Sequence, residues 1–167
     1  MNKQHFEFFK NHEVPSLNFY KNCSPDILLN KIDQDSYILD VGCGENQLKP
    51  YFKNLIGIDS VFSQADVQTD LEDYYTDIKF DVVLCFSVLI FGSESSIDAQ
   101  IAKIVSFLKP KSSIYWRLVP CSKMESSERY QWSHEKLNEF AIKYNYIQTA
   151  DTIIESGRLY AEWHREL

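Results

Sequence analysis

Four short stretches of the chain are almost continuously apolar. They occupy residues 37–41, 55–59, 80–86 and 113–119, and polar residues, glycine or proline flank each of them. A strand with one solvated face alternates apolar and polar residues, whereas a strand buried on both faces is apolar throughout. Strands of the second kind occur in parallel sheets that helices cover on both sides. The pattern therefore predicts four parallel strands.

Helical patterns separate these strands. Ser24, Pro25 and Asp26 have the composition of a helix start. Apolar residues recur at helical spacing over 97–108, before Pro110, which we expect to end that helix, and again after Ser133. Two further strands are expected at 146–154 and 158–163. This alternation predicts an α/β fold: a doubly wound, mostly parallel sheet of about seven strands, or slightly fewer, in a three-layer Rossmann-like sandwich.

Composition restricts the partners of this fold. The 167 residues suit a single domain, and the net charge of −7, without a basic cluster, argues against duplex nucleic acid. No apolar run approaches the roughly 20 residues that span a bilayer, and the first residues do not resemble a signal peptide. The four cysteines, including Cys23 and Cys121, are too scattered for a disulfide framework or a zinc site. We expect a cytoplasmic monomer or homodimer without membrane or metal binding.

Two glycines follow the first predicted strand. Gly42 and Gly44 permit a sharp turn and a close approach of a ligand, at the edge where open α/β sheets bind ligands. A dinucleotide site would have a third glycine where this chain has Gln47, and Glu45 would place a negative charge near the phosphates. The turn is thus either a plain connection or a site for a ligand other than NAD.

Carboxylates follow the next two strands. Asp59 ends the second strand and could accept hydrogen bonds from both ribose hydroxyls of an adenosine. Asp70 lies where a third strand would end, and could accept from an adenine amino group while the Leu71 amide donates to the ring. Either acid could also be an ordinary turn or surface residue. The position of these two acids at the ends of consecutive strands favours an adenosine site.

These motifs, taken in order, resemble those of class I, Rossmann-like S-adenosylmethionine-dependent methyltransferases. The resemblance covers about residues 36–150, including the fourth-strand motif at 80–89, Leu108-Lys109-Pro110 and Trp132-Ser133. It is closest to the small-molecule, "type 11"-like branch, which has small members encoded by phages or bacteria. It implies S-adenosyl-L-methionine as cofactor, with Asp40 ordering the glycine loop. The residues that it places around the cofactor are Gly42, Cys43, Gly44, Asp59, Ser60, Asp70, Leu71, Phe86, Ser87 and Val88.

Three departures from the family pattern bear on function. Ile90-Phe91 stand where the family often has an acid and a histidine, and Lys111-Ser112 replace the usual glycine pair. The helix after the second strand is missing, because only six residues separate Asp59 from Asp66. The first two departures leave the substrate class open, and the third shortens one wall of the cofactor site.

Four residues near the fifth strand are candidates for the acceptor side. Arg117 could clamp a substrate carboxylate or form a surface salt bridge, and Trp132 with Tyr130 could form an apolar wall or anchor the core. His134 could be a general base or a solvated residue at a helix start. No catalytic residue is assigned, because a base is needed only for an acceptor with a proton of high pKa.

The sequence predicts methyl transfer to a small-molecule oxygen, nitrogen or carboxyl group. Residues 1–35 would form an N-terminal helical cap whose aromatic residues pack on the domain or cover a ligand. Residues 36–119 would form the cofactor-binding half and residues 120–167 the substrate side. The alternatives are a non-catalytic regulator or partner subunit that binds S-adenosylmethionine or S-adenosylhomocysteine, a nucleic-acid or protein methyltransferase and, more distantly, a nicotinamide enzyme.

Overall fold

The fold is described from a computed structural model of the chain. It covers residues 22–120, 129–149, 153–155 and 157–166, with residues 6, 7, 10, 11 and 16 near the N-terminus. Most of the predicted N-terminal cap before residue 22, and Cys121, lie outside the described residues. The elements in chain order are α2 (Pro25–Lys31), β1 (Ile38–Val41), η2 (Lys49–Tyr51), β2 (Leu55–Asp59), β3 (Val67–Gln68), β4 (Phe80–Phe86), α3 (Glu94–Ser106), β5 (Leu108–Leu118), α4 (His134–Lys143), β6 (Ile147–Gln148), β7 (Ile153–Glu155) and β8 (Arg158–Arg165).

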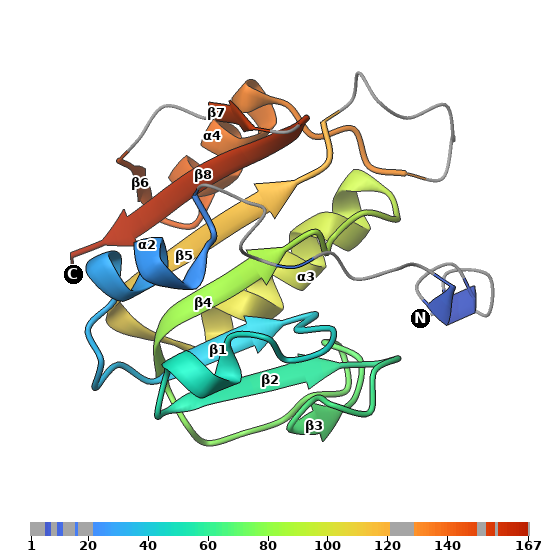
Figure 1. The fold of residues 1–167 in the computed structure, drawn as a ribbon. Coiled ribbons are helices and arrows are strands. Elements are labelled where there is room, and N and C mark those ends of the chain that lie inside the picture. Colours follow the sequence, from blue (N-terminus) through green and yellow to red (C-terminus); the bar gives the residue numbers. More distant parts are fainter. Residues whose placement is uncertain are drawn as a thin grey trace.

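All the named strands belong to one sheet (Figure 1). Their order is β3-β2-β1-β4-β5-β8-β6, and β7 also pairs with β8. Neighbours from β3 to β5 are parallel, whereas β8 is antiparallel to β5, β6 and β7. Seven strands in a row, most of them parallel, confirm the predicted sheet.

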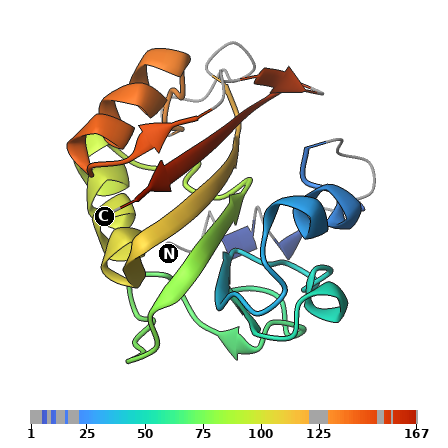
Figure 2. The same cartoon turned by 90° about the vertical axis from the view of Figure 1, so that its left-hand side faces the viewer.

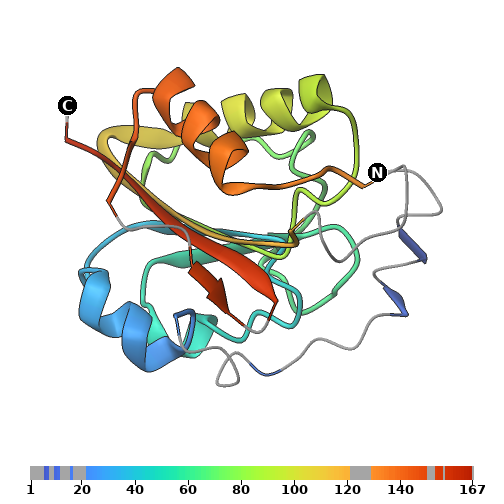
Figure 3. The ribbon, with the colours of Figure 1, turned by 90° about the horizontal axis from the view of Figure 1, so that it is seen from above.

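Helices cover both faces of the sheet. α3 and α4 lie on one side, and α2 and η2 lie on the other (Figures 2 and 3). This confirms the three-layer arrangement. The side of α2 and η2 carries less helix, because no helix occurs between Asp59 and Val67. No helix in the described part of the chain is both long and apolar enough to cross a membrane.

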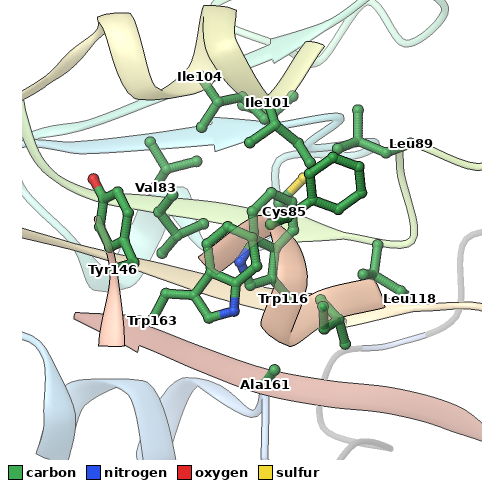
Figure 4. Packing of buried hydrophobic residues seen from close by; sticks show 14 of the residues in the cluster. Val83, Cys85, Leu89, Ile101, Ile104, Trp116, Leu118, Tyr146, Ala161 and Trp163 are labelled. Carbon is green, nitrogen blue, oxygen red and sulfur yellow. The ribbon is translucent and has the colours of Figure 1, made fainter. Parts of the chain in front are cut away.

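The larger part of the core lies under α3 and α4. Ile101 and Ile104 of α3 are fully buried in the same cluster as Val83 and Cys85 of β4 (Figure 4). The rings of Trp116 and Trp163, on β5 and β8, meet edge to face with centroids 4.8 Å apart. Burial of this apolar surface stabilises the sheet and thereby holds the carboxyl ends of its strands in place.

The helix starts agree with their local signals. The Ser93 hydroxyl accepts a hydrogen bond from the Ser96 amide at 3.3 Å at the start of α3. The Ser133 hydroxyl accepts from the Lys136 amide at 3.2 Å at the start of α4. Each serine thereby satisfies one of the amides that a helix leaves without an internal partner.

Two strand predictions need correction. β5 begins at Leu108 and contains Pro110, which was expected to end the preceding helix ahead of the strand. Leu108 pairs with Phe80 but Ser113 pairs with Val82, so an irregularity takes up the residues between, where a proline is tolerated because no ladder hydrogen bond is lost.

The strand expected over 146–154 is split into β6 and β7. Gln148 pairs with Trp163 and Ile153 pairs with Tyr160. From one of these pairs to the other the chain advances five residues, from 148 to 153, but β8 advances only three, from 163 to 160. A continuous ladder is impossible across such a mismatch, because pairing in a regular ladder advances one residue at a time on both strands.

Candidate functional site

The carboxyl ends of β1, β2 and β4 meet at one edge of the sheet. Val41, the last residue of β1, pairs with Ile58 on one side and with Cys85 on the other. The turns that follow these strands are consequently neighbours, and the strand arrows in Figure 1 point to the same edge. This edge holds the predicted glycine turn and Asp59.

The glycine turn is tightly held, and its position 42 has no room for a side chain. Gly42 and Gly44 have left-handed backbones, with φ of 69° and 55°. The amides of Gly42 and Cys43 both donate to the Ile58 carbonyl, at 2.8 and 3.1 Å. A Cβ atom on Gly42 would lie 2.0 Å from Cγ1 of Val88. Position 42 therefore requires glycine for its backbone angle and for the approach of Val88.

The carboxylate of Asp59 organises this turn. Its Oδ2 accepts from the Gly44 amide at 3.0 Å, and its Oδ1 accepts from the amides of Val61 and Phe62 at 2.7 and 3.1 Å. A carboxylate offers about four acceptor positions, so three are taken within the chain. The remaining position, on Oδ2, accepts from no described residue, and the contact of Asp59 with a ribose stays a prediction.

Asp40 is a buried carboxylate without a donor. It is 5% exposed, and no described residue donates a hydrogen bond to its side chain. Burial, and next the charge of Asp59, raises its pKa to about 7. Burial also raises the pKa of the Cys43 and Cys85 thiols, as does the charge of Asp40, so both remain neutral thiols. The site thus holds a potential anion to which the described residues donate no hydrogen bond, which favours a ligand with a cationic group.

A polar network under the turn was not anticipated from the sequence. Asp66 accepts from the Gly57 amide at 2.8 Å, from Asn46 Nδ2 at 3.3 Å and from Lys49 Nζ at 3.0 Å. Lys49 Nζ also donates to the Leu55 carbonyl at 2.6 Å. These bonds tie the loop after β1 to the loop after β2, where the expected helix is missing. The only local signal is Asn46, a residue type that tolerates its left-handed φ of 57°.

The adenine-side candidates lie beside Asp59. β3 ends at Gln68, two residues before Asp70. The Thr69 amide donates to the Asp59 carbonyl at 2.9 Å, which keeps this segment next to β2. Ser60, Asp70 and Leu71 are all half-buried. The structure therefore brings Asp70 and Leu71 to the predicted edge, and their contact with an adenine remains a prediction.

Arg117 lies at the end of β5 beside the turn after β4. It is 7% exposed, so its side chain is not a surface group. Its Nη1 donates to the Ser87 hydroxyl at 2.7 Å, and the Ser87 amide donates to the Arg117 carbonyl at 2.6 Å. Phe86, Ser87 and Val88 are half-buried at the same edge. Arg117 is thereby hydrogen-bonded directly to one of the predicted cofactor-side residues.

The other acceptor-side candidates are less accessible or further away. Trp132 and Tyr130 are 1% and 8% exposed and pack on each other with ring centroids 4.8 Å apart. This arrangement favours core anchors over a substrate wall. His134 is the exposed first residue of α4, and no hydrogen bond or ion pair within the described residues joins it to the sheet edge.

The fold has well-matched relatives among solved structures, although no protein-family model and no curated protein sequence matches the chain. The N-methyltransferase NodS from Bradyrhizobium japonicum WM9, in complex with S-adenosylhomocysteine, superposes with a TM-score of 0.75 at 15% identity, over 98% of both chains. The magnesium protoporphyrin IX methyltransferase ChlM from Synechocystis PCC 6803, with S-adenosylmethionine bound, gives 0.68 at 14% identity, over 99% of this chain and 93% of that one.

A third structure adds a bound acceptor. The 1,6-didemethyltoxoflavin-N1-methyltransferase of Burkholderia thailandensis, with 1,6-didemethyltoxoflavin and S-adenosylhomocysteine, gives a TM-score of 0.68 at 14% identity, over 86% of this chain and 76% of that one. Identities this low establish the architecture and not the activity. The chain has the Rossmann-like fold of these S-adenosylmethionine-dependent methyltransferases.

Proposed function

We propose that this chain binds S-adenosylmethionine across the carboxyl edge of β1, β2 and β4 and transfers its methyl group to a small molecule. Two observations at neighbouring positions carry the proposal: Gly42 has no room for a Cβ, and the Asp40 carboxylate is buried and receives no hydrogen bond from the described residues. The shared fold supports it, because the three methyltransferases compared above hold S-adenosylmethionine or S-adenosylhomocysteine.

The residues at this edge fit such a cofactor. S-adenosylmethionine carries an ammonium and a sulfonium, and a positive ligand would stabilise the ionised form of Asp40. The free acceptor position on Asp59 Oδ2 would take one ribose hydroxyl. Asp70 and the Leu71 amide follow at the edge of β3, where the adenine would lie. Cys43 and Gly44 would face the methionine part through their backbone.

The cofactor would supply an electrophilic methyl group, which the acceptor would attack in line while the methyl–sulfur bond breaks and S-adenosylhomocysteine leaves. The contribution of the chain is then to align the two reactants and to exclude water. Ser87 and Val88 would border the reacting centre, and Arg117 would face the acceptor. An acceptor that is already ionised, such as a carboxylate, needs no base. Acceptors with an oxygen, nitrogen or carboxyl nucleophile are therefore all compatible with this site.

A second function, binding without catalysis, is favoured by one observation. Only η2 follows β1, and no helix follows β2, so the wall on that side of the site is short. A regulator or partner subunit that senses S-adenosylmethionine or S-adenosylhomocysteine would need the same binding edge. It would not need an enclosed acceptor site.

Calorimetry and turnover separate these functions. We expect the protein to bind both S-adenosylmethionine and S-adenosylhomocysteine, and to form S-adenosylhomocysteine with a member of a panel of small carboxylates, amines and hydroxyl compounds. RNA, DNA and peptide acceptors in the same panel test the nucleic-acid and protein alternatives. Binding without turnover on any acceptor would favour the regulator. Failure to bind either ligand would overturn both functions.

The variant Asp59→Ala localises the site. Loss of its acceptor should weaken S-adenosylmethionine binding by roughly 1–3 kcal/mol, the usual cost of leaving a buried polar group unpaired. Because Asp59 also holds the Gly44, Val61 and Phe62 amides, the thermal stability of the variant must be measured beside its affinity. Unchanged affinity in a folded variant would remove Asp59 from the ribose role.

In this proposal, residues 36–119 form the cofactor-binding half of one domain and residues 120–167 its acceptor side. The protein would act in the cytoplasm as a monomer or homodimer. Size-exclusion chromatography coupled to light scattering would determine which of the two it is.

A further inference from the structure

We propose that Trp132 is a positioning residue: its indole N–H, through the Leu89 carbonyl, holds the turn at residues 87–89 so that Val88 lies against Gly42. The inference rests on the proposed function, because Val88 and Gly42 would flank the methionine part of the cofactor. It gives Trp132 a role in binding although the side chain is 1% exposed and contacts no ligand itself.

The turn after β4 is strained. Ser87 and Leu89, on either side of Val88, have left-handed backbones with φ of 63° and 52°. Residues other than glycine in this region cost about 1–3 kcal/mol each and persist only where their surroundings hold them. The conformation of residues 87–89 therefore depends on contacts from elsewhere in the chain.

Those contacts come from the second half of the chain. Arg117 exchanges two hydrogen bonds with Ser87, one by its guanidinium and one by its carbonyl. Trp132 Nε1 donates to the Leu89 carbonyl at 2.8 Å, and the Tyr130 amide donates to the Ile90 carbonyl at 2.8 Å. Val88 is thus held from both of its neighbours, by three residues that are themselves candidates for contact with the acceptor.

The position of the Trp132 ring is itself fixed. It packs against Tyr130, with an interplanar angle of 74°, and against Phe140 of α4 at a centroid distance of 5.9 Å. A ring locked in this way directs its N–H at one acceptor without further loss of side-chain freedom. Among the described residues, Trp132 is the donor to the Leu89 carbonyl, so its loss would remove that hydrogen bond.

The other tryptophans provide a matched control. Trp163 and Trp116 are fully buried in the same core, but their indole N–H groups have no hydrogen-bond partner. Changing Trp163 to phenylalanine removes a similar volume from the core and breaks no hydrogen bond. The pair of variants Trp132→Phe and Trp163→Phe therefore separates loss of packing from loss of positioning.

Two measurements on these variants test the inference. Trp132→Phe should raise the Kd for S-adenosylhomocysteine by roughly three- to tenfold, the effect of one buried hydrogen bond. It should also speed amide hydrogen exchange over residues 87–91, measured by mass spectrometry. Trp163→Phe should lower the melting temperature yet leave both quantities as in the wild type. Ser87→Ala removes the hydrogen bond between the Ser87 hydroxyl and Arg117, on the other side of Val88, and should have the same two effects as Trp132→Phe. It provides a second test if Trp132→Phe folds poorly.

The outcomes distinguish the inference from the function on which it rests. If the wild type binds S-adenosylhomocysteine and Trp132→Phe binds it equally well, or if both tryptophan variants weaken it alike, Trp132 is only a core residue. If the wild type binds neither S-adenosylhomocysteine nor S-adenosylmethionine, the proposed function itself is overturned, and the positioning role with it. Weaker binding and faster exchange confined to Trp132→Phe and Ser87→Ala would support both.

Discussion

Replacing Gly42 by alanine tests the central contact of the candidate site. The added methyl group would lie 2.0 Å from Cγ1 of Val88 and 3.4 Å from its Cβ. Carbon atoms in contact normally stand about 3.5–4.0 Å apart. The methyl group and Cγ1 must therefore separate by about 1.5 Å or more, and the strained turn around Val88 resists this movement.

The cost has two parts that can be estimated separately. An L-residue at φ 69° costs roughly 1–2 kcal/mol relative to glycine. Overpacking against Val88 adds roughly 1–3 kcal/mol. We expect Gly42→Ala to lower the free energy of unfolding by about 2–5 kcal/mol. In a Val88→Ala background both γ-carbons are absent, so only the backbone cost should remain.

Urea unfolding followed by tryptophan fluorescence measures this double-mutant cycle, because Trp116, Trp132 and Trp163 are all buried. Gly157→Ala supplies the control: Gly157 has φ of 70°, similar to that of Gly42, but lies beside β8. Its cost should be the same with valine or alanine at position 88.

The reasoning is refuted if Gly42→Ala costs the same free energy in both backgrounds, since no coupling would then exist between positions 42 and 88. A cost below that of Gly157→Ala would refute the need for glycine at this turn altogether.

Two further predictions concern pH. Because burial raises the pKa of Asp40 to about 7, the folded state favours its protonated form, and the wild type should lose stability relative to Asp40→Asn as pH rises from about 4 to about 7. At pH 8 the free energy of unfolding of the wild type, measured with urea, should be lower than that of Asp40→Asn by at most roughly 4 kcal/mol. The same variant should bind S-adenosylmethionine more weakly. An identical pH profile of stability for the two proteins would refute the burial argument. The His164 imidazole, whose Nε2 lies 3.6 Å from Glu162 Oε2, followed by the hydrogen bonds from Lys31 and Tyr160, lowers the pKa of Glu162 to about 2. The contribution of Glu162 to stability is therefore present above about pH 4.5 and is lost as pH falls towards 2. Glu162→Gln should cost about 1.5–3 kcal/mol at pH 7 and flatten the acid limb of the unfolding curve, whereas Glu166→Gln, at an exposed residue, should do neither.

Local patterns were sufficient to predict most elements of the fold and the strand ends that meet at the candidate site. The apolar runs of β2 and β4 were found with their observed bounds, because a strand buried on both faces needs apolar side chains throughout. The turn at Gly42 and Gly44 was found because only glycine adopts left-handed angles at little cost. The extension of β5 across Pro110 was missed, since its irregular pairing with Phe80 is not a local property.

Only the tertiary structure decided which polar and aromatic groups meet at that site. Trp132 and Leu89 are 43 residues apart in the chain, and Arg117 and Ser87 are 30 apart. A hydrogen bond acts over about 3 Å, so its partners are known only once the strands are aligned. Asp59 shows the same division: the sequence by itself predicted only that it lies at a strand end. The fold then showed that three of its acceptor positions already serve backbone amides.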